Sequence, residues 1–124
     1  MKLRLLDDSI RMRLSRREVD AANRSGVVEG QTRFPDGSMF RFALEAGEGE
    51  TAPSAAYESD RMVVRLPASE ISAWATDDTA VSLTGELDLP DGGPLVLLVE
   101  KDFQCLAPRE GEDQSELFSN PQQS

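Results

Sequence analysis

The chain has 124 residues, a net charge of −10 at pH 7, one cysteine and no histidine. This length suits a single domain that buries a core without metal or disulfide support, and the lone Cys105 cannot form an internal disulfide. The absence of histidine excludes Ser-His-Asp and Cys-His catalysis and histidine-based zinc chemistry. Carboxylates, Lys2, Lys101 and Tyr57 are then the main groups left for proton transfer. Enzymatic activity is therefore not favoured, and no cofactor is expected.

Charge is unevenly distributed along the chain. Residues 1–26 carry seven Arg or Lys and four Asp or Glu, a net of +3, whereas residues 27–124 carry six and nineteen, a net of −13. A largely acidic body repels nucleic acid and anionic membranes, so neither is an expected partner. Arg11 and Arg13 alternate as on the solvated face of a strand, and an anion-binding patch is the less favoured interpretation. No stretch resembles a signal peptide or a membrane span, so a cytoplasmic protein is expected.

The first predicted elements are two strands that form a hairpin. Leu3 and Leu5, then Ile10, Met12 and Leu14, alternate with polar residues on either side of a DDS turn. Alternation of this kind is typical of a hairpin with one buried face.

A helix is predicted to begin after Ser15. Ser15 and Glu18 form an S-x-x-E capping box, in which the two side chains satisfy unpaired amides at the helix start. The helix is expected to run to about Asn23 and to end before Gly26, because glycine accepts the positive φ of a helix stop.

Two further strands, joined by a Pro-Asp-Gly turn at residues 35–37, are predicted to follow this helix. In such a turn proline restricts φ, aspartate bonds back to the backbone and glycine accepts positive φ. The same turn recurs at residues 90–92, before the apolar stretch PLVLLVE at 94–100. That stretch is expected to be a central strand covered on both faces.

The order of elements recurs in the second half of the chain. DDSIRMRLSRREVDA at 7–21 matches SDRMVVRLPASEISA at 59–73 at an offset of 52, and GQTRFPDGSMFRFALE at 30–45 matches GELDLPDGGPLVLLVE at 85–100 at an offset of 55. A three-residue insertion explains the change of offset. In the second helix Pro67 suits the first turn, and Ile71 and Trp74 lie on one face. The pattern predicts a duplicated unit of about 55 residues.

Each unit is predicted to be β-β-α-β-β, so that the chain forms an α+β domain of about eight antiparallel strands and two short helices. The sheets are expected to form a sandwich or a barrel, because one unit alone would expose its apolar face and its edges. The predicted domain covers residues 1–106, with unit one at 1–45, a linker at 46–54 and unit two at 55–106. Residues 107–124 form an acidic tail rich in Pro, Gln and Ser. A groove at the junction of the units is the expected ligand site.

The segment VEKDFQCLAPREGED at 99–113 extends beyond the part of the second unit that the first unit matches. Alternation places Phe103 and Cys105 on one face, which favours Cys105 as a small buried hydrophobic residue at a strand end. Two chemical alternatives stay open. In one, Lys101 or Arg109 lowers the thiol pKa and makes Cys105 a reactive thiolate. In the other, a metal ion is held by Cys105 and by the carboxylates of Asp102, Glu110, Glu112 and Asp113.

A structural alternative is also open for this segment. Arg109 and the neighbouring acidic residues would hold the tail across the sheet by charge-assisted hydrogen bonds and cover an exposed edge.

The start MKLRLLDDSIRMRLSRREV, the middle TRFPDG with FRFALEA, and above all VEKDFQCLAPREGED resemble a family of small uncharacterised bacterial proteins, a domain of unknown function. Members of that family carry a similar K-D-F-x-C-L segment followed by Arg and Glu-Asp. The resemblance covers residues 1 to about 121 and implies no activity, cofactor or partner. It draws attention to one group of candidate binding residues, namely Lys101, Asp102, Cys105, Arg109, Glu112 and Asp113.

The favoured interpretation is a small cytoplasmic binding or interaction module, monomeric or homodimeric, for a protein or small-molecule partner. The duplicated sheet would present a groove, and the C-terminal segment would form its rim. The alternative is a small thiol-dependent redox protein or enzyme that uses Cys105 with Asp102 and Lys101.

Overall fold

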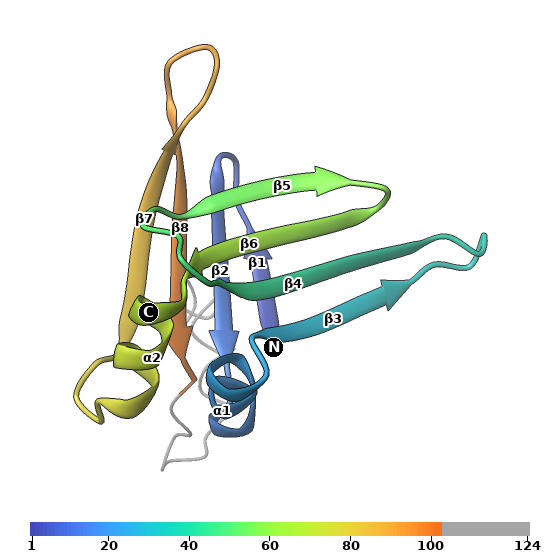
Figure 1. The fold of residues 1–124 in the computed structure, drawn as a ribbon. Coiled ribbons are helices and arrows are strands. Elements are labelled where there is room, and N and C mark those ends of the chain that lie inside the picture. Colours follow the sequence, from blue (N-terminus) through green and yellow to red (C-terminus); the bar gives the residue numbers. More distant parts are fainter. Residues whose placement is uncertain (103–124) are drawn as a thin grey trace, which may run out of the picture.

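A computed structural model of the protein describes residues 1–102 (Figure 1). Cys105, Arg109, Glu112, Asp113 and the predicted tail at 107–124 lie outside the described residues. The elements occur in the order β1 (Lys2–Leu5), β2 (Ser9–Leu14), α1 (Arg16–Arg24), β3 (Val27–Arg33), β4 (Met39–Gly47), β5 (Ser54–Glu58), β6 (Arg61–Pro67), α2 (Ala68–Thr76), β7 (Ser82–Asp88) and β8 (Pro94–Lys101).

The strands form two four-stranded sheets, which we call sheet A (β1-β2-β8-β7) and sheet B (β3-β4-β6-β5). Each sheet takes one hairpin from each unit, because the helix between the two hairpins of a unit carries the chain from one sheet to the other. Figure 1 shows the two sheets crossing, with both helices at the same end of the molecule. The predicted α+β class with two similar β-β-α-β-β units is confirmed, and the described sheets do not close into a barrel.

The sheets are mixed, whereas antiparallel sheets were expected. Every hairpin is antiparallel, but the two hairpins of each sheet meet in a parallel pair, β2 with β8 and β4 with β6. Alternation and turn chemistry predict pairing inside a hairpin, where the strands are neighbours in sequence. They do not indicate which distant hairpin completes the sheet, so the parallel junctions were missed.

Strand registers in the two sheets correspond at the offsets found in the sequence. Arg13 of β2 lies opposite Glu100 of β8, and their counterparts Arg65 of β6 and Glu45 of β4 lie opposite each other. The same offsets relate β1 and β2 to β5 and β6, and β3 and β4 to β7 and β8. The three extra residues fall after the second helix, since residues 25–26 follow α1 and residues 77–81 follow α2.

The first helix begins and ends where its sequence predicts, and the second begins directly after Pro67, which was expected inside the first turn. Ser15 Oγ accepts a hydrogen bond from the Glu18 amide, the Ser15 amide donates to the Glu18 carboxylate, and Gly26 follows the helix with φ of 83°. In the second helix, Pro67 occupies the N-cap with φ of −55°. The buried residues of α2 are Ile71 and Trp74, as their spacing predicted.

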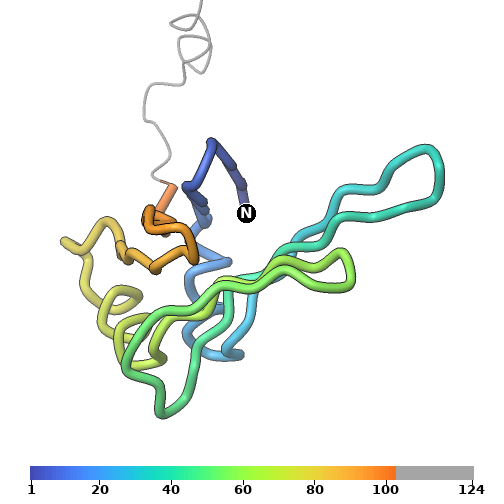
Figure 2. The backbone as a smooth tube through the Cα atoms, turned by 90° about the horizontal axis from the view of Figure 1, so that it is seen from above, coloured from blue at the N-terminus to red at the C-terminus, as the bar shows by residue number. Residues whose placement is uncertain are grey.

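The core lies between the inner faces of the sheets and beneath the helices. Its fully buried members include Met12, Leu14, Leu44, Val64, Leu66, Ile71, Trp74, Leu97 and Val99. Figure 2 shows that β3–β4 and β5–β6 project beyond this core. As predicted, β8 is a central strand, but only its inner face is fully covered, because Val96 on its outer face is 39% exposed.

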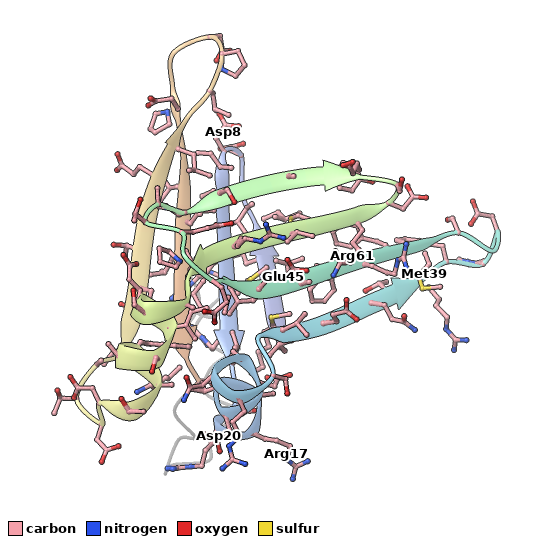
Figure 3. All side chains as sticks on the ribbon, viewed as in Figure 1. Asp8, Arg17, Asp20, Met39, Glu45 and Arg61 are labelled. Atoms are coloured by element: carbon pink, nitrogen blue, oxygen red, sulfur yellow. The ribbon has the colours of Figure 1, made fainter. Side chains whose placement is uncertain are left out.

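An arginine and a glutamate join the two hairpins of each sheet across the parallel junction. In sheet A, Arg13 Nη2 lies 3.1 Å from Glu100 Oε1, and in sheet B, Arg65 Nη2 lies 2.6 Å from Glu45 Oε1. Arg61 also contacts Glu45, at 3.3 Å, and Figure 3 shows both residues on one face of sheet B. Paired opposite charges at this register favour it over a shifted register.

Sheet B should lose stability in acid through Glu45. Hydrogen bonds from Arg65, and then from Arg61, lower the pKa of Glu45 below its ordinary value of 4.5. A carboxylate with a lowered folded-state pKa stabilises the fold above its unfolded pKa, and that contribution disappears as the pH falls through the folded value. We expect Glu45→Gln to lower the free energy of unfolding by about 1 kcal/mol at neutral pH. Well below pH 4.5 the substitution should have no effect, because the Glu45 carboxylate is then protonated in the unmodified protein as well.

Urea denaturation across this pH range measures the effect. Glu58→Gln is the matched control, because Glu58 forms no ion pair within residues 1–102. A loss for Glu45→Gln that stays constant from neutral to acidic pH would contradict the assignment.

Candidate functional site

A pocket of about 580 Å³ lies where the two units meet, between α1, the end of α2 and the end of β8. Unit one contributes the end of β2 and the N-terminal part of α1. Unit two contributes the end of α2, Asp78 in the loop that follows it, and the end of β8 with the residue after it. Its lining residues are Leu14, Ser15, Arg16, Val19, Asp20, Ala75, Asp78, Lys101 and Asp102. This position agrees with the groove expected at the junction of the units.

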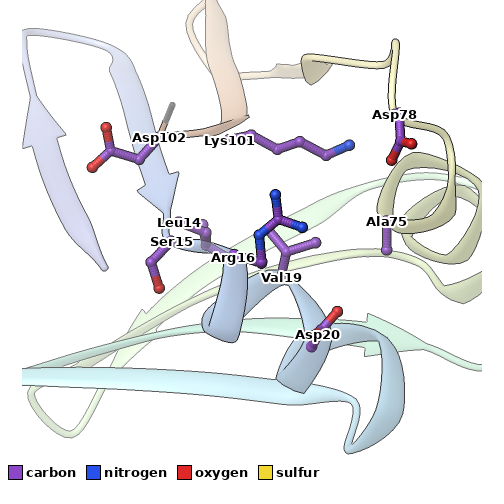
Figure 4. Close-up of a pocket in the computed structure, with 9 residues that line it drawn as sticks. All are labelled: Leu14, Ser15, Arg16, Val19, Asp20, Ala75, Asp78, Lys101 and Asp102. Atoms are coloured by element: carbon purple, nitrogen blue, oxygen red, sulfur yellow. The ribbon is translucent and has the colours of Figure 1, made fainter. Parts of the chain in front are cut away.

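The pocket has an apolar floor and a charged rim. Leu14 and Val19 are buried core residues, and Ala75 packs against the same core. The rim holds two cations and three carboxylates, which are Arg16, Lys101, Asp20, Asp78 and Asp102. Figure 4 shows the Arg16 guanidinium and the Lys101 side chain approaching the same space from α1 and β8. The site therefore offers both signs of charge beside an apolar surface.

Lys101 is held in place by α2 and the loop that follows it. Its Nζ donates a hydrogen bond to the carbonyl oxygen of Asp77 at 3.0 Å and lies 5.7 Å from the centre of the Trp74 ring. Hydrogen bonds from the Thr79 hydroxyl and amide lower the pKa of Asp77, so its carboxylate is charged near the Lys101 ammonium. These contacts place a cation at the pocket entrance next to a fully buried indole.

Asp102 faces the other way and links the pocket to β1. Its amide donates to the Leu14 carbonyl at 2.8 Å, and its carboxylate lies 3.2 Å from Lys2 Nζ. Figure 4 shows the side chains of Asp102 and Lys101 pointing in opposite directions. Of the six candidate binding residues, these two are described and both line the pocket.

The matched location in the molecule, where α2 begins beside the end of β4, lacks the charges that line this pocket. At the 52 and 55 offsets, Arg16 corresponds to Ala68, Asp20 to Ser72, Lys101 to Ala46 and Asp102 to Gly47. Asp78 lies in the longer loop that follows α2 and has no counterpart after α1. Because the same framework forms with small residues at the corresponding positions, the fold does not require these charges.

Three of the charged rim residues were not singled out from the sequence, namely Arg16, Asp20 and Asp78. A charged residue in the first turn of a helix looks like an ordinary solvated position. For Arg16 and Asp20 the usable signal was the small residue at the matched position, Ala68 and Ser72, whereas Asp78 has no matched position.

The described carboxylates do not form a metal cluster. Within residues 1–102, no three Cys, Asp or Glu side chains gather closely enough to hold a metal ion. In the same part of the chain, neither helix has the length and apolar character needed to cross a membrane.

The model of one protein family, described as a family of unknown function (DUF7009), matches residues 1–122. The chain belongs to this family. No curated protein and no solved structure gives a significant match. The expected membership of an uncharacterised family is thereby confirmed, while the bacterial origin and the shared K-D-F-x-C-L segment stay predictions. Since DUF7009 carries no assigned activity, the pocket itself is the basis for a functional proposal.

Proposed function

We propose that this DUF7009 protein is a binding module whose ligand occupies the pocket between α1 and the end of β8. One observation carries the proposal: charged side chains surround the pocket, whereas the matched positions at α2 and at the end of β4 hold the small residues Ala68, Ser72, Ala46 and Gly47. Arg16, Asp20 and Asp78 are exposed, so their charges cost the fold little, and a ligand with complementary groups would give them a role that the framework does not. The volume of about 580 Å³ lies within the usual range of small-molecule sites.

The rim supports a small ligand that carries both an anionic and a cationic group. Within residues 1–102, Arg16 forms no ion pair, so its guanidinium is available to bind a carboxylate in the bidentate manner. Asp20 and Asp78 likewise form no ion pair in that part of the chain and would accept an ammonium group. Leu14, Val19 and Ala75 supply an apolar contact. An amino acid or a short peptide has this combination of groups.

The thiol-dependent alternative receives less support from the described contacts. It requires Cys105 to act with Lys101 and Asp102, and Cys105 lies outside the described residues. Lys101 is engaged with the Asp77 carbonyl and the Trp74 ring, and Asp102 is engaged with Lys2. We therefore keep the binding module as the proposed function.

Thermal unfolding with a panel of L-amino acids and dipeptides tests the proposal. A ligand that binds only the folded chain raises Tm with its concentration. We expect at least one member of the panel to raise the Tm of the unmodified protein. That shift should be lost in Arg16→Gln and in Lys101→Gln.

Arg41→Gln is the control variant, since Arg41 is an exposed arginine of β4 that lines no part of this pocket. Native mass spectrometry of the freshly purified chain gives an independent readout of any ligand already bound. A bare native mass with no Tm shift from any panel member would reject the small-ligand proposal. Equal shifts in the pocket variants and in the unmodified protein would place binding elsewhere.

A further inference from the structure

The outer face of sheet A carries four basic side chains on two adjacent strands. The register sets Lys2 opposite Arg13 and Arg4 opposite Arg11. All four point away from the core, because the residues between them, including Leu3 and the buried Met12, face inward. We call Lys2, Arg4, Arg11 and Arg13 the basic grid.

Few described carboxylates balance this grid. Glu100 contacts both Arg11, at 2.9 Å, and Arg13, at 3.1 Å, so one carboxylate serves two guanidinium groups. Asp102 contacts Lys2 at 3.2 Å, and within residues 1–102 Arg4 forms no ion pair. Four cations thus share two carboxylates, which leaves a surplus of two positive charges in a chain whose net charge is −10.

The second unit shows that the fold does not require the grid. At the offset of 52, Lys2 corresponds to Ser54, Arg4 to Ala56, Arg11 to Val63 and Arg13 to Arg65. Only the arginine that pairs across the parallel junction is kept in both units. Three of the four basic residues are therefore specific to sheet A.

The other feature specific to sheet A is the chain that continues beyond β8. The matching strand β4 leads into β5, whereas β8 is followed by residues 103–124. The chain leaves sheet A beside the grid, since Lys101 pairs with Leu14 and the Asp102 carboxylate contacts Lys2. Residues 103–124 contain four carboxylates and one arginine, a net of −3, and the acidic residues are Glu110, Glu112, Asp113 and Glu116.

We propose that the acidic segment 110–116 docks on the basic grid of its own chain. The seven residues 103–109 reach about 23 Å when extended, at about 3.3 Å per residue, and the grid extends only about 7 Å along the strands. Arginine and carboxylate groups then form charge-assisted, often bidentate hydrogen bonds. The asymmetry of the chain supports this pairing, because the unbalanced cations and the additional carboxylates occur on the same sheet and near the same end of it.

Neighbouring residues restrict where the segment would lie. Glu86 and Asp88 of β7 lie beyond β8, and their charge repels an acidic segment from that side. Asp7 and Asp8 in the turn between β1 and β2 do the same at the far end. Val96 lies on β8 beside the grid and is 39% exposed. It offers an apolar contact to the two large apolar residues after the acidic run, Leu117 and Phe118.

Paramagnetic relaxation enhancement in the full chain tests the proposal. Cys105 is the only cysteine, so Cys105→Ser with Ser115→Cys places a single nitroxide label inside the acidic segment. We expect the label to broaden the amide signals of residues 2–4 and 11–13 more than those of the matched residues 54–56 and 63–65. Molar salt should abolish this difference, because screening weakens contacts between exposed charges.

A second variant removes the charge of the acidic segment 110–116. It combines Glu110→Gln, Glu112→Gln, Asp113→Asn and Glu116→Gln, and so leaves residues 1–102 unaltered. This variant should lose the selective broadening and keep the spectrum of the rest of the chain. Arg4→Gln with Arg11→Gln should lose it too, whereas Arg41→Gln on sheet B should retain it.

Three outcomes would overturn the proposal. Selective broadening of residues 14–20 and 75–78 would place the segment in the pocket. Broadening seen only between a labelled chain and a separate isotope-enriched chain would assign the grid to a second copy. Broadening that the neutralised segment leaves unchanged would show that charge does not direct it. Because this readout uses no added ligand, its failure is independent of the proposed pocket function.

Discussion

Trp74→Ala is expected to lower the free energy of unfolding by about 3–5 kcal/mol, the range for removing a buried tryptophan. The side chain is only 1% exposed, and its indole Nε1 donates a hydrogen bond to the Val81 carbonyl at 3.1 Å. Alanine would leave a cavity beneath α2 and remove one of the two hydrogen bonds that the Val81 carbonyl accepts, the other coming from the Lys101 amide at 3.0 Å. Because Lys101 lies over the same ring, the variant should also lose any ligand-induced Tm shift.

Urea denaturation followed by circular dichroism measures this loss. Tyr57→Ala is the matched control, since this aromatic side chain on edge strand β5 is 63% exposed. We expect the control to cost about 1 kcal/mol or less. Similar losses for the two variants would mean that α2 does not pack as the structure describes.

Gly30→Ala is expected to destabilise the protein by about 1–3 kcal/mol, the usual cost of adding a group to a filled space. A Cβ atom at Gly30 would lie 2.6 Å from the Cε2 and Cζ atoms of Phe42, on the neighbouring strand. The Phe42 ring is 8% exposed and covers the glycine, so the ring has to move away from the core contacts it makes.

Two other glycines, Gly85 and Gly93, allow the loss of stability to be compared across decreasing crowding by the same denaturation measurement. At the matched position Gly85, a Cβ would lie 3.1 Å from Pro53 Cγ and 3.9 Å from Leu97 Cδ1, so Gly85→Ala should cost less than Gly30→Ala. At Gly93 a Cβ meets nothing within 4 Å, and Gly93→Ala should be close to neutral. If Gly30→Ala destabilised the protein less than Gly85→Ala and Gly93→Ala, Phe42 would not lie over Gly30.

The elements and their order were predictable because their signals are local. The capping box at Ser15 and Glu18, the glycine after the first helix and the two Pro-Asp-Gly turns each depend on residues close together in sequence. The offsets of 52 and 55, and the insertion between them, follow from comparing one half of the chain with the other. The site was less predictable: the C-terminal segment points to Lys101 and Asp102, but no local pattern distinguishes Arg16, Asp20 and Asp78 from ordinary solvated residues.

The sequence by itself therefore determined the ten elements, their grouping into two similar units, and the one buried face of the first hairpin, because periodicity and turn chemistry act between near neighbours. Only the tertiary structure decided that each sheet combines hairpins from both units through a parallel pair. That pairing joins strands far apart in the chain, and the alternation within a strand does not specify its partner. The pocket follows from the same pairing, since it brings the start of α1 beside the end of β8.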